Sequence, residues 1–251
     1  MKPFGFLRKE VLEILKTPKW IVLTAVFIVF GIMSPIAAKY MNELIAGIGG
    51  LELNLPEPTY IDAYIQFFKN MYGLSIFVVI MTFMSMVVEE KVRGTALLVL
   101  TKGLSRTSFL LCKFFAASFF FSVVYALSMG VFLYYTFLLF PDHSMQNVGG
   151  SLFLFWLYGV CLIASTLLCS TLSKSHTIAA VSSFAFFMIL SLSHLIPRIG
   201  HYLPGSYQTM GVEIMTGVKG VASLVVPISF AVVFISVTLF VTVLLFRQQE
   251  L

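Results

Sequence analysis

Six long apolar runs alternate with shorter polar stretches along this chain of 251 residues. A helix needs about 20 apolar residues to cross the roughly 30 Å hydrocarbon layer of a bilayer, and each run meets that length within a residue or two. The pattern predicts an all-α integral membrane protein with six transmembrane helices. Their approximate bounds, placed to within about 2 to 4 residues, are 20–38, 71–88, 114–138, 152–172, 177–196 and 225–246.

The segment before the first run, residues 1–19, is patterned as an amphipathic helix. Its apolar side chains recur at helical spacing on one face, whereas Lys9 and Lys16 lie on the other. Pro18 breaks the helix, and Trp20 marks the headgroup level. We predict a helix that lies in the membrane interface; the alternative is a basic anchor that only fixes orientation. The apolar positions are Phe4, Leu7, Val11, Ile14 and Leu15.

The distribution of charge predicts the orientation of the chain. Only 11% of the residues are charged, against roughly a quarter in soluble domains. Positive flanks are retained in the cytoplasm, and an N-terminus inside places 12 of the 16 Lys and Arg residues there, so we predict both termini to be cytoplasmic. These residues flank spans instead of covering one soluble face, which argues against nucleic acid as a partner. They are Lys2, Arg8, Lys9, Lys16, Lys19, Lys91, Arg93, Lys102, Arg106, Lys113, Lys174 and Arg247.

Residues that could carry chemistry are scarce inside the predicted spans. His194 is the only ionisable Asp, Glu, Lys, Arg or His within them, and its place near an outer end favours an interfacial role. A proton-driven carrier usually needs buried ionisable groups, so that class is disfavoured. The sequence contains no Gly-x-Ser-x-Gly, His-Glu-x-x-His or P-loop motif, and no Cys pair has metal-ligand spacing. We expect no enzymatic activity and no directly bound cofactor or metal.

Two predicted spans carry stripes of small side chains at intervals of four residues, which let helix backbones approach closely. Three interpretations stay open: contact within one subunit, contact between subunits, or a lining of a transport path. One stripe consists of Ser118, Ser122, Ala126 and Gly130, and the other of Cys161, Ser165, Cys169 and Ser173.

The connector between the second and third spans, residues 89–106, reads EEKVRGTALLVLTKGLSR. Thr95 can cap a short helix that Gly103 can end, and Ser105 can cap the helix of the third span. The short helix carries Leu97, Leu98 and Leu100. Exposed leucines on such a helix suit a groove on a partner protein; alternatively, they lie on the membrane surface.

The residues of this connector resemble those of permease subunits of type-2 ABC exporters. The matching pattern is Glu-Glu-x-x-x-Gly-Thr, a leucine-rich turn, Ser-Arg, and a Lys six to seven residues later, although Gly103 stands where many relatives have Pro and Cys112 where Gly is common. The resemblance implies a coupling helix that docks on a separate ATP-hydrolysing subunit, which binds ATP and Mg²⁺. It also implies a second permease, identical or different, and a prokaryotic cell membrane.

By this resemblance the coupling residues are Glu89, Glu90, Arg93, Gly94, Thr95, Leu97, Leu98, Leu100, Ser105, Arg106 and Lys113. Glu90, Arg93 and Arg106 are expected to form ion pairs at the rim of the docking site. The three leucines are expected to be its buried anchors. Gly94 is expected to permit a close turn after the second span.

The two long outer loops, 40–70 and 197–224, contain several Pro and Gly residues and are expected to be solvated connections. In the resembled family the loop before the last span often forms short re-entrant helices, and Tyr207–Met215, YQTMGVEIM, could form one turn of this kind. The whole chain, 1–251, is interpreted as one transmembrane domain of an ABC exporter that forms the transport pathway. The alternatives are an ATP-independent channel or carrier and a membrane scaffold.

Overall fold

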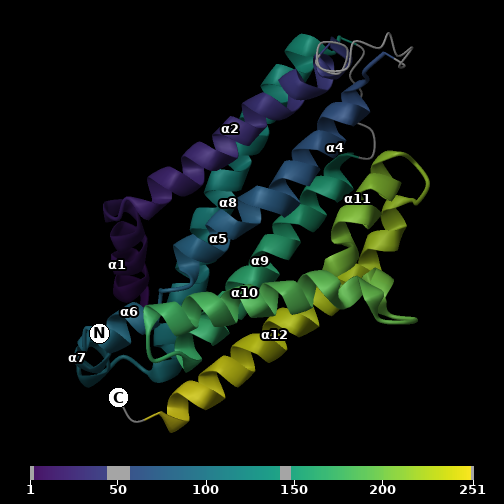
Figure 1. Cartoon of the computed structure of the whole chain (residues 1–251). Helices are drawn as coiled ribbons and strands as arrows, with labels where there is room; N and C mark the ends of the chain where they lie inside the picture. Colours follow the sequence, from purple (N-terminus) through teal and green to yellow (C-terminus); the bar gives the residue numbers. More distant parts are fainter. Residues whose placement is uncertain (1–2, 44–56, 142–147, 250–251) are drawn as a thin grey trace.

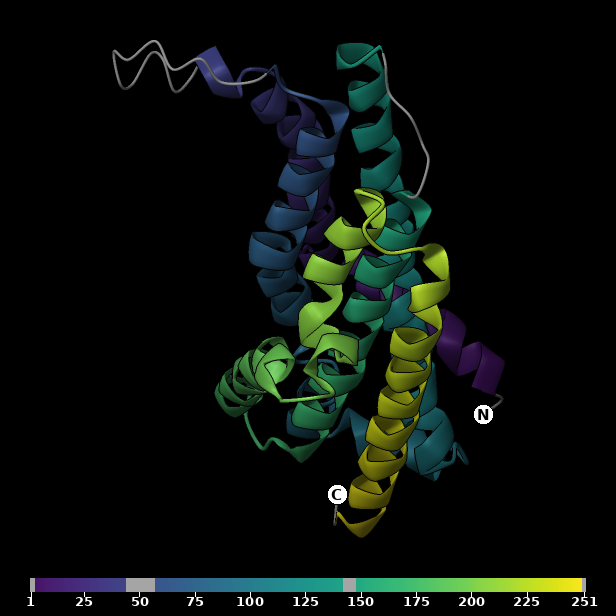
Figure 2. The ribbon, with the colours of Figure 1, turned by 90° about the vertical axis from the view of Figure 1, so that its right-hand side faces the viewer.

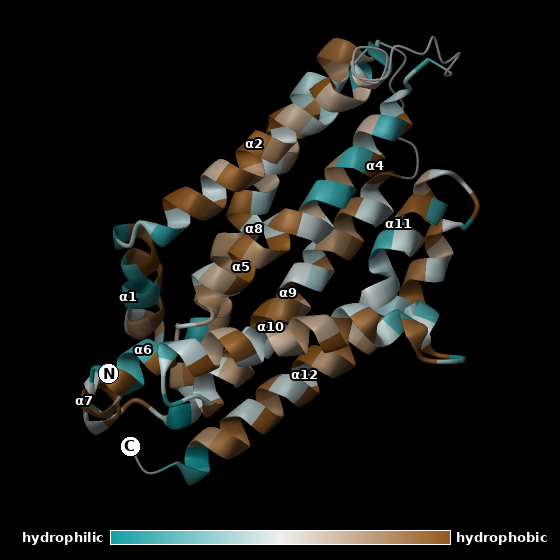
Figure 3. Ribbon diagram, viewed as in Figure 1, coloured by the Kyte–Doolittle hydropathy of each residue, from teal (hydrophilic) through white to brown (hydrophobic). Residues whose placement is uncertain are grey.

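The computed structural model describes residues 3–43, 57–141 and 148–249, and these residues form helices and turns without a β-strand. Six helical segments are long and apolar enough to cross a membrane, which confirms the predicted all-α class with six spans (Figure 1). Figure 3 shows hydrophobic residues along these helices and hydrophilic residues gathered near their ends. The segments are Lys19–Lys39, Tyr60–Val92, Arg106–Leu139, Val148–Leu172, His176–Leu195 and Val221–Gln248. The orientation of the termini stays a prediction.

An amphipathic helix precedes the first span, but its buried face differs from the predicted one. Helix α1 (Pro3–Lys16) packs against α8 (Arg106–Leu139) and buries Phe6 and Glu10 there. Phe4, assigned to the apolar face, is 80% exposed. The chain turns at Thr17 and Pro18 and enters α2 (Lys19–Lys39), which also packs along α8.

The second span begins earlier than the sequence predicted. Helix α4 (Tyr60–Asn70) leads through a π-helical turn, η1 (Met71–Ser75), into α5 (Ile76–Phe83). The predicted start at 71 is therefore wrong, because α4 is amphipathic and its polar face interrupts the apolar run. Of the predicted outer loop 40–70, residues 60–70 are helical, and 44–56 lie outside the described residues.

Helix α9 (Val148–Leu172) is the most enclosed span, because 78% of the residues in its apolar stretch are buried. The corresponding fractions are 22% for the span of α10 (His176–Leu192) and 17% for that of α12 (Val225–Gln248). Figure 2 shows α10 almost end-on while α9 and α12 are seen along their length, so α10 is inclined to both. The exposed apolar surfaces of α10 and α12 suit lipid or a second subunit.

The two stripes of small residues lie in different surroundings. Cys161, Ser165 and Cys169 of α9, and Ser173 directly after it, are all buried in the bundle, where close helix packing needs small side chains. On α8, Ser118 and Ser122 are half-buried, whereas Ala126 and Gly130 are exposed on this chain. Contact within one subunit, contact between subunits and a lining of a transport path all stay predictions for these stripes.

The segment between α10 and α12 contains a helix at the predicted place. Helix α11 spans Tyr207–Met215 and packs against α9, where the Ser151 hydroxyl donates to the Gly211 carbonyl. The Tyr207 hydroxyl donates to the Pro227 carbonyl of α12 over 2.8 Å. Figure 1 places α11 beside the first turns of α12, at the end of the bundle opposite α7. His194 lies in the exposed turn after α10, near the end of the span as predicted.

The contact between α2 and α8 depends on Gly31. The Ser128 hydroxyl of α8 donates to the Phe27 carbonyl of α2 over 2.6 Å, and a Cβ atom at Gly31 would lie 2.9 Å from the Ser128 carbonyl oxygen. A side chain at this position would therefore force two backbones apart. At Gly130, which is also inside a helix, an added Cβ meets no atom within 4 Å.

We expect Gly31→Ala to destabilise the protein by about 1 to 3 kcal/mol, the usual cost of forcing extra atoms into a packed site. Thermal unfolding in detergent would measure this as a lower Tm. Gly130→Ala is the matched control and should leave Tm unchanged or raise it, because Ala is the better helix former. Equal Tm values for the two variants would contradict the close contact.

Candidate functional site

The connector folds into two short helices at one end of the bundle. Helix α6 (Val88–Val92) follows a turn after α5, and α7 (Thr95–Thr101) follows α6. Gly94 separates them with a φ of +70°, a left-handed conformation that Gly adopts without steric cost. The prediction that Thr95 caps α7 is wrong: Gly94 is the N-cap residue, and the Thr95 hydroxyl donates to the Glu90 carbonyl over 3.4 Å.

Two other predictions for the connector are confirmed, namely that Gly103 ends the short helix and that Ser105 caps the helix of the third span. Gly103 has a φ of +83°, and its N–H donates to the Leu100 carbonyl, which ends α7. The Ser105 hydroxyl accepts a hydrogen bond from the Ser108 N–H over 3.1 Å and caps α8. The connector therefore leaves α5 and enters α8 through defined turns.

Helix α7 presents only part of its apolar surface outward. Leu97 is 48% and Leu98 62% exposed, whereas Ala96 is buried and Leu100 packs partly against the core. Two of the three predicted anchors therefore face outward. Figure 1 shows α7 at the end of the molecule where α12 also ends, and at the edge of that end.

Next to the connector lies an ion-pair cluster with a buried centre, which we call the Lys113 cluster: Lys9, Glu10, Glu13, Glu90 and Lys113. Glu10, Glu90 and Lys113 are buried, whereas the side chains of Lys9 and Glu13 are partly exposed. The side chain of Lys113 is 4% exposed, and its Nζ lies 2.8 Å from Glu10 Oε2 and 3.1 Å from Glu90 Oε1. Lys9 Nζ also contacts Glu90 Oε1, over 2.9 Å. Glu10 comes from α1, Glu90 from α6 and Lys113 from α8, so the cluster joins three helices that are distant in sequence.

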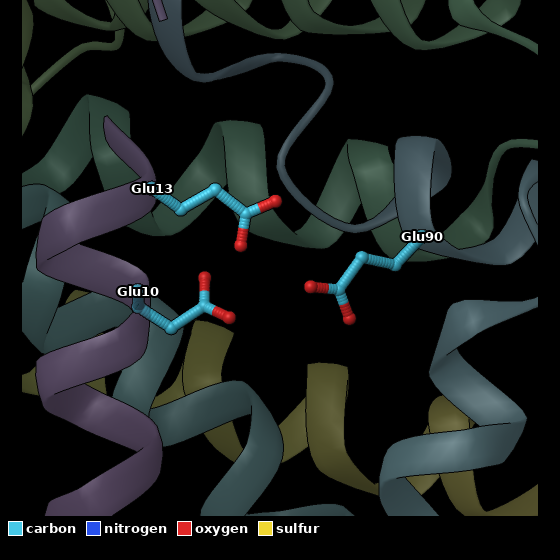
Figure 4. A group of neighbouring side chains, drawn as sticks. All are labelled: Glu10, Glu13 and Glu90. Carbon is cyan, nitrogen blue, oxygen red and sulfur yellow. The ribbon is translucent and has the colours of Figure 1, made fainter. Parts of the chain in front are cut away.

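Figure 4 shows the carboxylates of Glu10 and Glu13 facing that of Glu90 across a short gap. One oxygen of each lies within 4.8 Å of the others, a spacing that a metal ion could use. However, Lys9 Nζ lies within 3.1 Å of all three carboxylates, and Lys113 Nζ binds two of them. Because two ammonium groups already compensate two of the three negative charges and occupy the space between the acids, the arrangement favours internal ion pairs over metal coordination.

The surroundings of Lys9 affect its protonation. Burial of the ammonium lowers its pKa, but the carboxylates of Glu13, Glu10 and Glu90 outweigh that effect, so the pKa of Lys9 is raised above its ordinary value. Lys9 therefore stays protonated up to strongly alkaline pH. The stabilisation that it contributes is present throughout the neutral range and is lost only above the pKa of an unfolded lysine.

A second, more exposed layer of charge covers the cluster. The Lys19 ammonium donates to the Ser85 hydroxyl over 2.8 Å and pairs with Glu89 over 3.5 Å. Glu89 also pairs with Arg93 over 2.8 Å. A cleft of about 90 Å³ opens beside these residues, between α1, α5 and α8. Water reaches this layer, so its pairs contribute less stability than the buried ones.

Two of the three residues predicted to form exposed ion pairs around the docking site, Glu90 and Arg106, do not do so. Glu90 is 5% exposed and contacts Lys113 and Lys9. Arg106 donates to backbone carbonyls at the end of α12. Arg93 is the one of the three expected rim residues with a largely exposed side chain, at 66%.

Sequence reasoning missed Glu10 as a member of this site. A usable signal was present, because Glu10 follows Phe6 by four residues and precedes Ile14 by four, which puts an acid in line with apolar positions. An acid on the packed face of a helix needs a buried cation. Lys113 is the residue that supplies it.

These features define a class of protein: a multi-pass membrane protein with a short exposed helix between its second and third spans. Residues 6–200 match the family described as ABC-2 family transporter protein, and the chain belongs to that family. It is also similar to the uncharacterized transmembrane protein YxlG of Bacillus subtilis (strain 168), with 26% identity over 205 residues that cover 80% of each chain. The protein is therefore a multi-pass cell-membrane component of an ABC-2 transporter.

We expect Lys113→Met to lower the free energy of unfolding by about 3 to 5 kcal/mol, because it removes the buried cation and leaves Lys9 alone to compensate the buried carboxylates of Glu10 and Glu90. Arg93→Met, which removes a cation from the exposed Glu89 pair, should cost at most about 1 kcal/mol. Denaturant titration of both variants in detergent would measure the difference. Similar losses in the two variants would contradict the structural importance of the cluster.

Proposed function

We propose that this chain is the permease subunit of an ABC exporter and that a separate ATP-binding subunit docks on α7. The observation that supports docking most directly is the exposure of Leu97 and Leu98 on a helix at the extremity of the molecule. Two adjacent leucines that are exposed on a short helix outside the long spans suit a hydrophobic groove on a partner.

Helix α7 is presented in a fixed conformation. It has only seven residues, far fewer than the roughly 12 to 15 that an isolated helix needs in water. The turns at Gly94 and Gly103 and the helices on either side hold it in shape. A partner therefore binds a preorganised helix and spends little binding free energy on ordering it.

The energy for transport is proposed to come from the partner, which binds ATP and Mg²⁺. Closure of two ATP-binding subunits on ATP would displace α7, and the displacement would switch the membrane helices between inward and outward access. Two permeases, identical or different, would pair to form the pathway, with lipid around them. Export as the direction rests on the resemblance of the connector to type-2 exporters.

The test is a pull-down of the tagged chain from its native cells in mild detergent, with mass spectrometry of the proteins that stay bound. We expect an ATPase with a P-loop to copurify in stoichiometric amount with the unaltered chain. Leu98→Asp should remove it, because a charge placed in an apolar groove is left without a partner.

Val218→Asp is the matched control. Val218 is 73% exposed in the turn after α11, at the other end of the bundle, so the same kind of change is made away from α7. This variant should retain the ATPase. If Leu98→Asp retains it too, docking does not use α7; if a well-folded unaltered chain brings down no ATPase, a self-sufficient channel or a scaffold becomes the better interpretation.

A further inference from the structure

Two cations flank α7 in the chain, and each is bonded to the end of a different span. Lys91, on α6, donates to the Thr171 carbonyl over 2.7 Å and to the Ser173 carbonyl over 3.1 Å, at the end of α9. Just before it, the N–H groups of Val87 and Val88 donate to the Ser170 hydroxyl of α9 over 3.0 and 3.1 Å. The chain that enters α7 is therefore attached to α9.

The chain that leaves α7 is attached to α12 in the same way. Arg106 Nη1 lies 2.9 Å from the Phe246 carbonyl oxygen, 2.7 Å from that of Arg247 and 3.0 Å from that of Gln249. Its guanidinium also lies over the Phe246 ring, 5.9 Å from the centroid.

The Gln249 side chain joins the two attachments. Its Oε1 accepts from Lys91 over 2.9 Å, and its Nε2 donates to the Thr171 carbonyl over 3.1 Å. The backbone carbonyl of the same residue accepts from Arg106. We call this set of contacts the clamp: Lys91, Arg106, Gln249 and the carbonyls at the ends of α9 and α12.

The chemistry of the clamp matches what helix ends require. The last turn of a helix leaves carbonyl groups without intrahelical donors, and the helix dipole makes that end negative. An ammonium or guanidinium placed there satisfies several carbonyls at once with charge-assisted hydrogen bonds. The two cations therefore attach the segments before and after α7 to α9 and α12, two spans that pack against each other.

We propose that Lys91 and Arg106 are positioning residues that make α7 and the adjacent ends of α9 and α12 move as one body. This inference rests on the proposed function, because the ATP-binding subunit supplies the displacement of α7. Movement of α7 then reaches α9, the most enclosed span, and through α9 it reaches α11 at the opposite end. In this proposal the exposed leucines bind the ATP-binding subunit, and the clamp transmits the displacement of α7 to α9 and α12.

The test measures distances in the complex of the chain with its copurified ATP-binding subunit. Spin labels are attached at Thr101→Cys on α7 and Gly149→Cys at the far end of α9, where an added Cβ meets no atom within 4 Å. The chain's own cysteines at 112, 161 and 169 are buried. Helix α9 has 25 residues and is about 37 Å long, a separation suited to pulsed electron resonance. Nucleotide-free and ATP-vanadate-trapped samples are compared.

We expect one narrow distance distribution that is the same in both nucleotide states. Lys91→Met should broaden or shift the distribution in the trapped state, and Lys91→Arg should restore the narrow one. Lys174→Met is the matched control: it removes an exposed lysine at the same end of α9 and should behave like the unaltered clamp. Gln249→Ala, which leaves both cations in place, should give a smaller broadening.

The same measurement covers the other half of the clamp with labels at Thr101→Cys and Val225→Cys, at the far end of α12, and with Arg106→Met as the variant. A distance between α7 and α9 that changes with nucleotide in the unaltered clamp would overturn the inference. So would a Lys91→Met distribution as narrow and constant as the control. Either result, obtained with the ATP-binding subunit still bound, leaves the proposed function standing; absence of that subunit from the unaltered chain overturns both.

Discussion

The burial of one ammonium group, that of Lys113, constrains the arrangement of the connector end of the molecule. A buried cation that loses its partner costs several kcal/mol, so the carboxylates of Glu10 and Glu90 must come to it. Glu10 brings α1 onto α8, and Glu90 brings α6 onto the same helix. Lys9 neutralises the remaining charge. The ion pairs of Lys113 and Lys9 therefore fix the position of α6, the helix that precedes α7. Most contacts elsewhere in the bundle are apolar.

The two ends of the bundle are stabilised by different kinds of interaction. At the connector end, lysine and arginine side chains bridge acids and helix-end carbonyls, and these directional bonds define one geometry. At the other end, α11 and the first turns of α12 meet α9 largely through apolar side chains, with Tyr207 and Ser151 adding single hydrogen bonds. Apolar packing is less directional than these bonds, so rearrangement costs less at that end.

The sequence predicted the features that depend on local pattern. Apolar runs located the six spans, and Ser105, Gly103 and the Tyr207–Met215 segment were found from capping, turn signals and family resemblance. The start of the second span was missed, because the polar face of α4 lowers the hydropathy on which the search depended. The cap of α7 was misassigned by one residue, since Gly94 in a left-handed conformation and Thr95 are both acceptable there.

Contacts between distant segments could not be predicted in this way. Glu10 and Lys113 are 103 residues apart, and Arg106 and the end of α12 more than that, so no periodicity links them. The third span gives the reason: its predicted start at 114 lies just after Lys113 and leaves that residue in the connector, where a lysine is ordinarily solvated. Because α8 begins at Arg106, Lys113 lies inside the helix of the third span, where its charge needs buried partners.

The shortness of α7 has a consequence for inhibitors of the docking that we propose for this helix. A free peptide of its seven residues would be almost entirely unfolded in water, because nucleation of a helix costs more than so few hydrogen bonds return. The leucine pair would then be offered in the right geometry only a small fraction of the time, and the apparent affinity would fall by that fraction. A useful inhibitor must therefore reproduce the helical backbone of α7 as well as its leucine side chains. A covalent staple could replace the contacts that hold the helix in this fold.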